Sequence, residues 1–284
     1  MKFLKKLACV AAVAMSVAGG ANAATVLNDW HFNPTGGGFA GSQQVNEYLD
    51  VNGNAFIQIA PTGANSFSFT EHAVFNIVQA DSNSQLFPVN YPGGNISATF
   101  EATGSGNFSG AFSFSGGTIR MYQNATNEYG TTNGIYGANL GNQIAVFNVM
   151  AGGGGFVDAS GSPTNNGQVT VFAKADAGSL DAGYFFRENG DDLSLESILA
   201  FAFTNANTVA SPTGNLVSEV ACQYASFTGN GCNGQAYANT SSDFFVGNNG
   251  QFKLSEVPEP GSLALFGIAL LGAGVVSRKR AKKA

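Results

Sequence analysis

The stretch "NSFSFTEHAVFNIV" (residues 65–78) decides the fold class, because apolar and polar side chains alternate along it. Phe67 and Phe69 stand two residues apart, with Ser68 and Thr70 between and after them. Successive side chains of a β-strand point to opposite faces, so this period gathers the phenylalanines on one face of a sheet. The stretch therefore predicts a strand with one apolar and one polar face.

The same alternation recurs in "ISATFEA" (96–102), "GAFSFSG" (110–116) and "GQVTVFAKA" (167–175). Glycine-rich segments interrupt the pattern and supply residues for tight turns: "VNGNA" (51–55), "YPGGN" (91–95), "TGSGN" (103–107), "SGGT" (115–118), "AGGGG" (151–155) and "TGNGCNG" (228–234). Many short strands between glycine turns predict an all-β fold, an antiparallel sandwich or jelly-roll-like body. In "GDDLSLESILAFAF" (190–203), Asp191 or Asp192 is a candidate N-cap, so a short helix near 192–200 competes with a strand.

The N-terminus has the features of a secretory signal peptide. "MKFLKK" is basic, "LACVAAVAMSVAG" (7–19) is apolar, and Ala21 and Ala23 form a small-x-small cleavage site. Residues 1–23 are therefore expected to be removed on export. A lipoprotein anchored at Cys9 is disfavoured, because Lys6 stands where a lipobox requires an aliphatic residue.

The C-terminus "EVPEPGSLALFGIALLGAGVVSRKRAKKA" (256–284) combines Pro-Glu-Pro, an apolar run and a basic tail. As a helix, the 17 residues 261–277 reach about 25 Å, against about 30 Å for a hydrocarbon core. They predict a marginal transmembrane helix whose basic tail stays on the cytoplasmic side. The sequence therefore predicts that the chain has three parts: a signal peptide (1–23), an extracellular β-rich domain (24–256) and a sorting segment (257–284).

The predicted extracellular domain, residues 24–256, is called the body here, and its charge excludes some classes of partner. Between residues 24 and 256, four basic residues (Arg120, Lys174, Arg187 and Lys253) stand against 17 acidic ones, a formal charge of −13. Neutralising phosphates requires clustered Lys and Arg, so nucleic acid is not an expected partner. Disorder is also not expected, because the chain is 44% hydrophobic and contains 24 Phe.

Cys222 and Cys232 remain in the body, ten residues apart. In an exported chain such a pair predicts a disulfide, which stabilises by roughly 2 to 3 kcal/mol for a loop of this size. Zinc binding is the rival interpretation, but no histidine lies nearby to complete a ligand set.

Catalytic motifs are missing from the sequence, and we predict a protein that is not an enzyme and needs no cofactor or metal. His31 and His72 are the two histidines, and His72 follows Glu71 in a probable strand, where neighbouring side chains face opposite ways. The candidate carboxylates of a glycosidase are Glu188, Asp191, Asp192 and Glu196, and candidate calcium ligands are Asp176 and Asp181. A solvated turn with a helix cap explains the first group more simply.

Pro258, Glu259 and Pro260, the apolar run and "RKR" together resemble the PEP-CTERM sorting signal of Gram-negative bacteria. The resemblance implies that a membrane-embedded exosortase recognises these three residues, cuts the chain and releases it from a transient hold in the inner membrane. Substrates of exosortases accompany exopolysaccharide production. The body resembles the flocculation-associated PEP-CTERM proteins in "LNDWHFNPTGGGFAG" (27–41), "NEYLDVNGNAFIQ" (46–58), "EHAVFNIVQADSNSQLFP" (71–88), "GGTIRMY" (116–122) and "NLVSEVACQYASFTGNGC" (215–232).

The sequence thus predicts a non-catalytic matrix or adhesion protein on the outer surface, acting with extracellular polysaccharide in floc or biofilm formation. Uncharged Asn, Ser, Thr and Gly on its surface would hydrogen-bond sugar hydroxyls. A secreted carbohydrate-active enzyme and a calcium-dependent lectin-like module remain as alternatives.

Overall fold

The computed structural model describes residues 25–81, 94–163 and 167–257. Val26–Ser255 form one compact unit, and the other unit comprises 1–25 and 256–284, of which only Thr25, Glu256 and Val257 are described. The predicted signal peptide and transmembrane sorting helix therefore lie outside the described residues. Within these ranges, no helix has the length and apolar character needed to cross a membrane.

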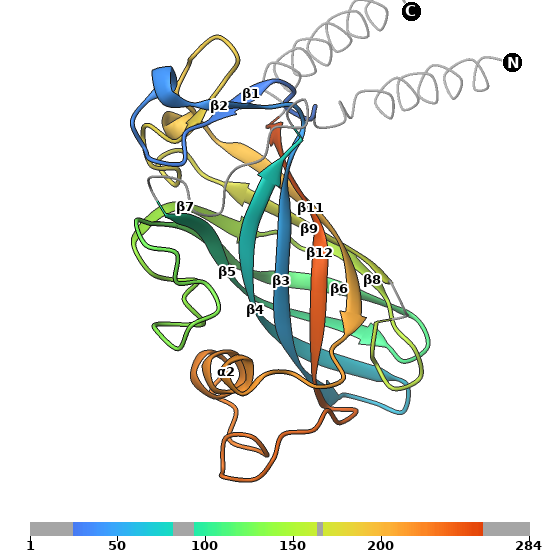
Figure 1. Cartoon of the computed structure of the whole chain (residues 1–284). Helices are drawn as coiled ribbons and strands as arrows, with labels where there is room; N and C mark the ends of the chain where they lie inside the picture. The colour runs from blue at the N-terminus through green and yellow to red at the C-terminus, as the bar shows by residue number, and fades with distance from the viewer. Residues whose placement is uncertain (1–24, 82–93, 164–166, 258–284) are drawn as a thin grey trace, which may run out of the picture. The chain divides into compact units, whose positions relative to one another are not determined.

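Eight antiparallel strands close into a barrel (Figure 1). They are β3 (Tyr48–Pro61), β4 (Ser66–Ala80), β5 (Asn95–Asn107), β6 (Ala111–Asn124), β7 (Asn142–Val149), β9 (Gly167–Ala175), β11 (Ile198–Thr208) and β12 (Asp243–Glu256). Each strand pairs with the next along the ring, and the pairings of β9 with β11 and of β12 with β3 complete it. The short strand β8 (Gly152–Phe156) pairs with both β6 and β9. The predicted all-β class is confirmed, but the predicted sandwich or jelly roll is wrong.

The strands are also longer than predicted, because glycines expected in turns lie inside them. β3 to β6 have 13 to 15 residues each, and "VNGNA" is part of β3 while "TGSGN" ends β5. A Cβ at Gly53 would lie 2.2 Å from the carbonyl oxygen of Val74 and 2.5 Å from the Phe75 ring. One at Gly104 would lie 2.4 Å from the Phe69 ring. These glycines make room for close neighbours in the sheet rather than for turns.

One end of the barrel is closed by a small three-stranded sheet in the order β10–β1–β2 (Figure 1). Its strands are β1 (Trp30–Phe32), β2 (Gln43–Val45) and β10 (Phe185–Phe186), and the 3₁₀ turn η1 (Phe39–Gly41) joins the first two. Trp30, Phe32 and Phe185 are fully buried and belong to the same apolar core as the barrel interior. Close by, Val26 and Ser255 form an antiparallel bridge, so the unit's two ends lie side by side.

Of the two alternatives for 192–200, a helix or a strand, the structure has a short 3₁₀ turn followed by a strand. Asp192 does act as an N-cap, accepting a hydrogen bond from the Ser194 amide at 2.8 Å, but only the 3₁₀ turn η2 (Leu193–Leu195) follows before β11 begins. Ile198 and Ala200 then enter the core with the period of a strand.

The helical segment of the fold is α2 (Gly214–Leu216), continued by the π-helical η3 (Val217–Tyr224). The Thr213 hydroxyl caps it by accepting from the Leu216 amide at 3.3 Å. Its apolar face covers Phe56, Val74 and Phe245 on the outside of β3, β4 and β12, in a second, smaller core. The helical spacing of Leu216, Val217, Val220 and Ala221 is the signal that a sequence reading could have used.

Gly104 provides a test of the packing inside the barrel. An added Cβ would meet both the Phe69 ring and, at 2.3 Å, the backbone oxygen of Ser113, which cannot move without disturbing β6. We expect Gly104→Ala to lower the free energy of unfolding by about 1 to 3 kcal/mol, as overpacking does. Urea denaturation measures this directly.

Gly116→Ala is the matched control, because nothing lies within 4 Å of its Cβ position on the adjacent strand. We expect it to change stability by no more than about 0.5 kcal/mol. Equal effects of the two substitutions would contradict the packing described for β5.

Candidate functional site

The barrel interior contains a cavity lined almost wholly by apolar side chains. The cavity has a volume of about 80 Å³. Ile57, Phe75, Phe112, Val169 and Ala202 line it and keep part of their surface exposed, although they pack against the core and face inward. The interior is thus incompletely filled by its own side chains.

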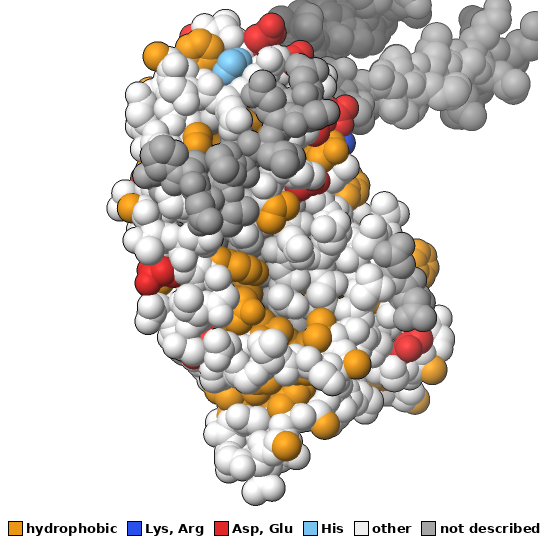
Figure 2. All heavy atoms as spheres, in the orientation of Figure 1, with side chains coloured by type: hydrophobic (Ala, Val, Ile, Leu, Met, Phe, Trp, Pro, Cys, Tyr) orange, Lys and Arg blue, Asp and Glu red, His pale blue; other side chains and the backbone are white. Residues whose placement is uncertain are grey.

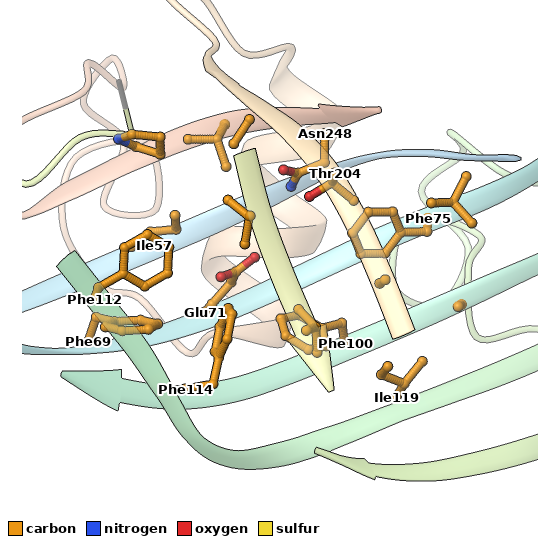
Figure 3. A pocket seen from close by; sticks show the side chains of 18 of the residues that line it. Ile57, Phe69, Glu71, Phe75, Phe100, Phe112, Phe114, Ile119, Thr204 and Asn248 are labelled. Carbon is orange, nitrogen blue, oxygen red and sulfur yellow. The ribbon is translucent and has the colours of Figure 1, made fainter. Parts of the chain in front are cut away.

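Glu71 on β4 points into this cavity. Along β4 the inward positions are Phe67, Phe69, Glu71, Ala73, Phe75 and Ile77, so Glu71 takes a place that the alternation otherwise reserves for apolar residues. Figure 3 shows its carboxylate directed into the space bordered by the rings of Phe69, Phe100 and Phe114. The residue keeps 8% of its surface exposed, and within the described ranges no hydrogen bond or ion pair reaches its carboxylate.

Two further polar side chains line the cavity, Thr204 on β11 and Asn248 on β12. Both are buried, and Figure 3 shows them close to one another on these neighbouring strands. In the described part of the lining, no residue other than Glu71 is titratable. The cavity is therefore an apolar space with three inward polar groups.

Burial raises the pKa of Glu71 from its ordinary 4.5 to about 7, because removal from water disfavours the charged carboxylate. Below that pH the folded protein holds a neutral carboxyl group, which can donate as well as accept a hydrogen bond. The sequence reading treated Glu71 only as a neighbour of His72. The signal that would have identified it is its position in the inward series begun by Phe67 and Phe69.

The outer side of the same wall is an uncharged polar surface, here called the neutral face. It consists of Ser66, Ser68 and Thr70 on β4, Thr103, Ser105 and Asn107 on β5, and Ser113 and Ser115 on β6. Ser68 lies opposite Ser105, which lies opposite Ser113, so the hydroxyls form rows across three strands. At its edge Phe156 on β8, opposite Ala111, is 67% exposed. Figure 2 shows that charged side chains are sparse on the side of the molecule in view.

Three of the four acidic residues in the 188–196 loop, Asp191, Asp192 and Glu196, have structural roles. Arg187 pairs with Glu196 at 2.6 Å, and Asp192 accepts hydrogen bonds from the amides of Gly183 and Ser194, each at 2.8 Å. Asp191 accepts from the Asn189 side chain at 2.8 Å. These are the contacts of a solvated turn with a cap, and Glu188 is exposed beside them.

The calcium candidates do not belong to a ligand cluster in the described residues. Asp176 forms an ion pair with Lys174 at 2.6 Å, and Asp181 is exposed on the next turn. A search of the described part of the chain finds no group of three or more His, Cys, Asp or Glu residues that could hold a metal ion.

The two histidines are far from forming a catalytic group with Glu71. The His31 ring lies 3.0 Å from the Ser42 hydroxyl and packs on Phe39. His72 lies on the outside of β4 against Tyr224 of η3, with ring centroids 4.9 Å apart, and burial lowers its pKa. Glu71 and His72 point to opposite sides of the sheet, as predicted.

Cys222 and Cys232 form the predicted disulfide, with Cα atoms 5.5 Å apart. It links η3 to the loop that contains Gly229 and Gly231. Within this loop the Cys232 amide donates a hydrogen bond to the Gly229 carbonyl at 3.0 Å. The disulfide thus fixes the loop below the helix that covers the second core.

Fold and sites together define a closed up-and-down β-barrel protein with an apolar cavity and a neutral outer face. A family model described as "PEP-CTERM protein-sorting motif" matches residues 256–280. The chain therefore carries a PEP-CTERM sorting motif, which indicates an exported protein that is processed by an exosortase and whose C-terminus is anchored in the membrane transiently. Searches of curated proteins and of solved structures give no match. Pro258, Glu259 and Pro260 lie outside the described residues, and the likeness of the body to flocculation-associated proteins stays a prediction.

Glu71 makes stability depend on pH. Its pKa is higher in the folded state (about 7) than in the unfolded chain (4.5), so the unfolded chain loses its proton first as the pH rises. We expect stability to fall between pH 4.5 and 7 by about 3 kcal/mol through this group and then to level off. Urea unfolding of Glu71→Gln should lack this part of the decline, whereas the exposed Glu188→Gln should retain it. Identical pH profiles for Glu71→Gln and the wild type would contradict the assignment.

Proposed function

We propose that the protein is a non-catalytic component of the extracellular matrix that binds exopolysaccharide and holds cells together in flocs or biofilms. The neutral face is the observation that carries this proposal. The sorting motif indicates export and processing by an exosortase, and we propose that the exported barrel meets the polymer outside the cell. The likeness of the body to flocculation-associated proteins supports the same role.

The neutral face suits a polysaccharide because its groups match those of the polymer. Strands lie about 4.8 Å apart, and side chains on one face of a strand repeat about every 6.8 Å, so the hydroxyls form a regular two-dimensional array. Each hydroxyl both donates and accepts, as sugar hydroxyls do. The Thr103 and Ser115 hydroxyls are 3.1 Å apart, which orients the pair without removing it from solvent. The exposed Phe156 ring adds an apolar surface on which the C–H face of a sugar ring can stack.

The non-catalytic class is supported by the contacts of the acidic loop. Asp192 and Glu196, two of the candidate glycosidase residues, are used in a cap and in the ion pair with Arg187. The formal charge of −13 on the body also favours an uncharged polymer over a strongly anionic one, because like charges repel at close range. The array of uncharged hydroxyls on the barrel wall supports a binding role.

Loss of the neutral face should abolish aggregation. We expect a deletion strain to keep producing exopolysaccharide but to form no flocs. A gene encoding Thr103→Ala, Ser105→Ala and Ser113→Ala together should not restore flocs, because the three hydroxyls leave the centre of the array. Floc size by light scattering and sedimentation of purified protein with the strain's polysaccharide measure the two effects.

Asn205→Ala with Asn249→Ala is the matched control, since both amides are exposed on β11 and β12, on another part of the wall. This double variant should restore flocs. Normal flocs in the deletion strain, or full rescue by the triple variant, would refute the proposal.

The sorting residues can be tested separately from the barrel. We expect Glu259→Ala to leave the chain uncut, because the resemblance to the sorting signal places Glu259 in the recognised Pro-Glu-Pro. Immunoblots should then find the protein in the membrane fraction, and mass spectrometry should find its C-terminus at Ala284. Glu188→Ala should be processed normally, and equal processing of both variants would remove Glu259 from the recognition site.

A further inference from the structure

We infer that the barrel interior is a binding site for a small, slender, mainly apolar molecule with one uncharged hydroxyl or carbonyl group, and that Glu71 contacts this group. The inference goes beyond the proposed function, which concerns the outer wall. It rests on the shape of the cavity, on its lining and on the placement of three polar side chains.

The size of the cavity limits the molecule. An eight-stranded barrel has an interior that side chains can just fill, or that holds one small ligand. Here Ile57, Phe75 and Ala202 point inward but remain partly exposed, and about 80 Å³ is open. That is about half of an engineered apolar cavity of roughly 150 Å³ that binds benzene. A thin alkyl chain of a few carbons fits such a space, whereas a lipid or a ring system does not.

The polar groups identify the second part of the molecule. A buried carboxyl group without a hydrogen-bond partner is unfavourable, and a ligand that supplies one removes this cost. Glu71 is more than nine-tenths buried and is directed into the cavity (Figure 3). Thr204 and Asn248 approach from other walls, because β4 lies three strands from β11 and two from β12 around the ring. A single hydroxyl or carbonyl in this space meets donors and acceptors on more than one side.

The residues that line the cavity indicate that the bound molecule is uncharged. An anion would lose its hydration in an apolar space and face the Glu71 carboxyl group without any cation among the described lining residues. A cation would also be desolvated, with one carboxyl group as its sole charged partner there. Because Glu71 is neutral below about pH 7, an uncharged hydrogen-bonding group is the better match.

The test uses the purified exported protein at pH 6 and three probes with three carbons each, which match the size of the cavity: 1-propanol, propylammonium and propanoate. Methyl NMR signals of the isoleucines and valines report binding, since Ile57, Ile77, Val169 and Val171 line the cavity. We expect 1-propanol to shift these signals in a saturable way and to bind at least fivefold more tightly than either charged probe. The methyl signals of Val217 and Val220, under the helix, serve as an internal control.

Substitutions test the hydrogen bond to Glu71 and the volume of the cavity separately. Glu71→Leu removes the carboxyl group and should weaken the binding of 1-propanol about fivefold, the loss of one hydrogen bond, while Glu71→Gln should retain most of the affinity. Ala202→Leu fills part of the cavity, keeps Glu71 and should abolish binding. Glu188→Gln should bind like the wild type.

Three results would overturn the inference. The first is no shift of the cavity methyl signals with 1-propanol, which would mean that the interior holds water alone. The second is unchanged affinity in either Glu71→Leu or Ala202→Leu, and the third is a preference for propylammonium or propanoate.

Discussion

Closure of the sheet is the constraint on which the rest of the structure depends. β12, the last strand, pairs with β3, the first long one, over eleven residue pairs, and β9 pairs with β11 over nine. These ladders leave the ring without a free edge, which would otherwise be a site for pairing with another chain. They also fix the strand number at eight, and the strand number sets the width of the interior. The incompletely filled cavity and the curved outer wall are both consequences of this closure.

Strand β4 connects the two sites, because its alternation serves both surfaces. Its odd-numbered side chains, Phe67 and Phe69 among them, form the cavity wall, and its even-numbered ones, Ser66, Ser68 and Thr70, belong to the neutral face. A shift of one residue in its pairing with β3 or β5 would exchange the two sets. The register is held by the large inward rings, such as Phe69 against Phe114 at 5.6 Å, so the packing of the core also positions the surface hydroxyls.

How far the sequence could predict this molecule differs from feature to feature. Period-two alternation in 65–78 was enough for strands, and the close spacing of Cys222 and Cys232 was enough for the disulfide. Alternation is the same in a sandwich and in a barrel, however, because both bury one face of each strand. The difference lies in which strands pair at long range, as β12 with β3, and no local pattern encodes that. The glycines were assigned to turns wrongly for a similar reason. Gly53 and Gly104 are required by close atoms on neighbouring strands, not by a turn in their own segment. Glu71 was missed because a carboxylate in a strand is normally expected to point outward. Its position two residues after Phe69, in the inward series of β4, predicts the opposite.

The bridge between Val26 and Ser255 has a consequence for the order of folding during export. A chain that crosses the membrane from its N-terminus delivers β3 early and β12 last, directly before the sorting motif. Until the final strand arrives, β3 and β11 each lack a neighbour, and the partly built sheet has two open edges. The barrel is therefore completed by the same few residues that precede the processing signal. A chain held at its C-terminus keeps β12 close to the open edges of β3 and β11 of the same chain. β12 then pairs with these edges in preference to the edges of other copies.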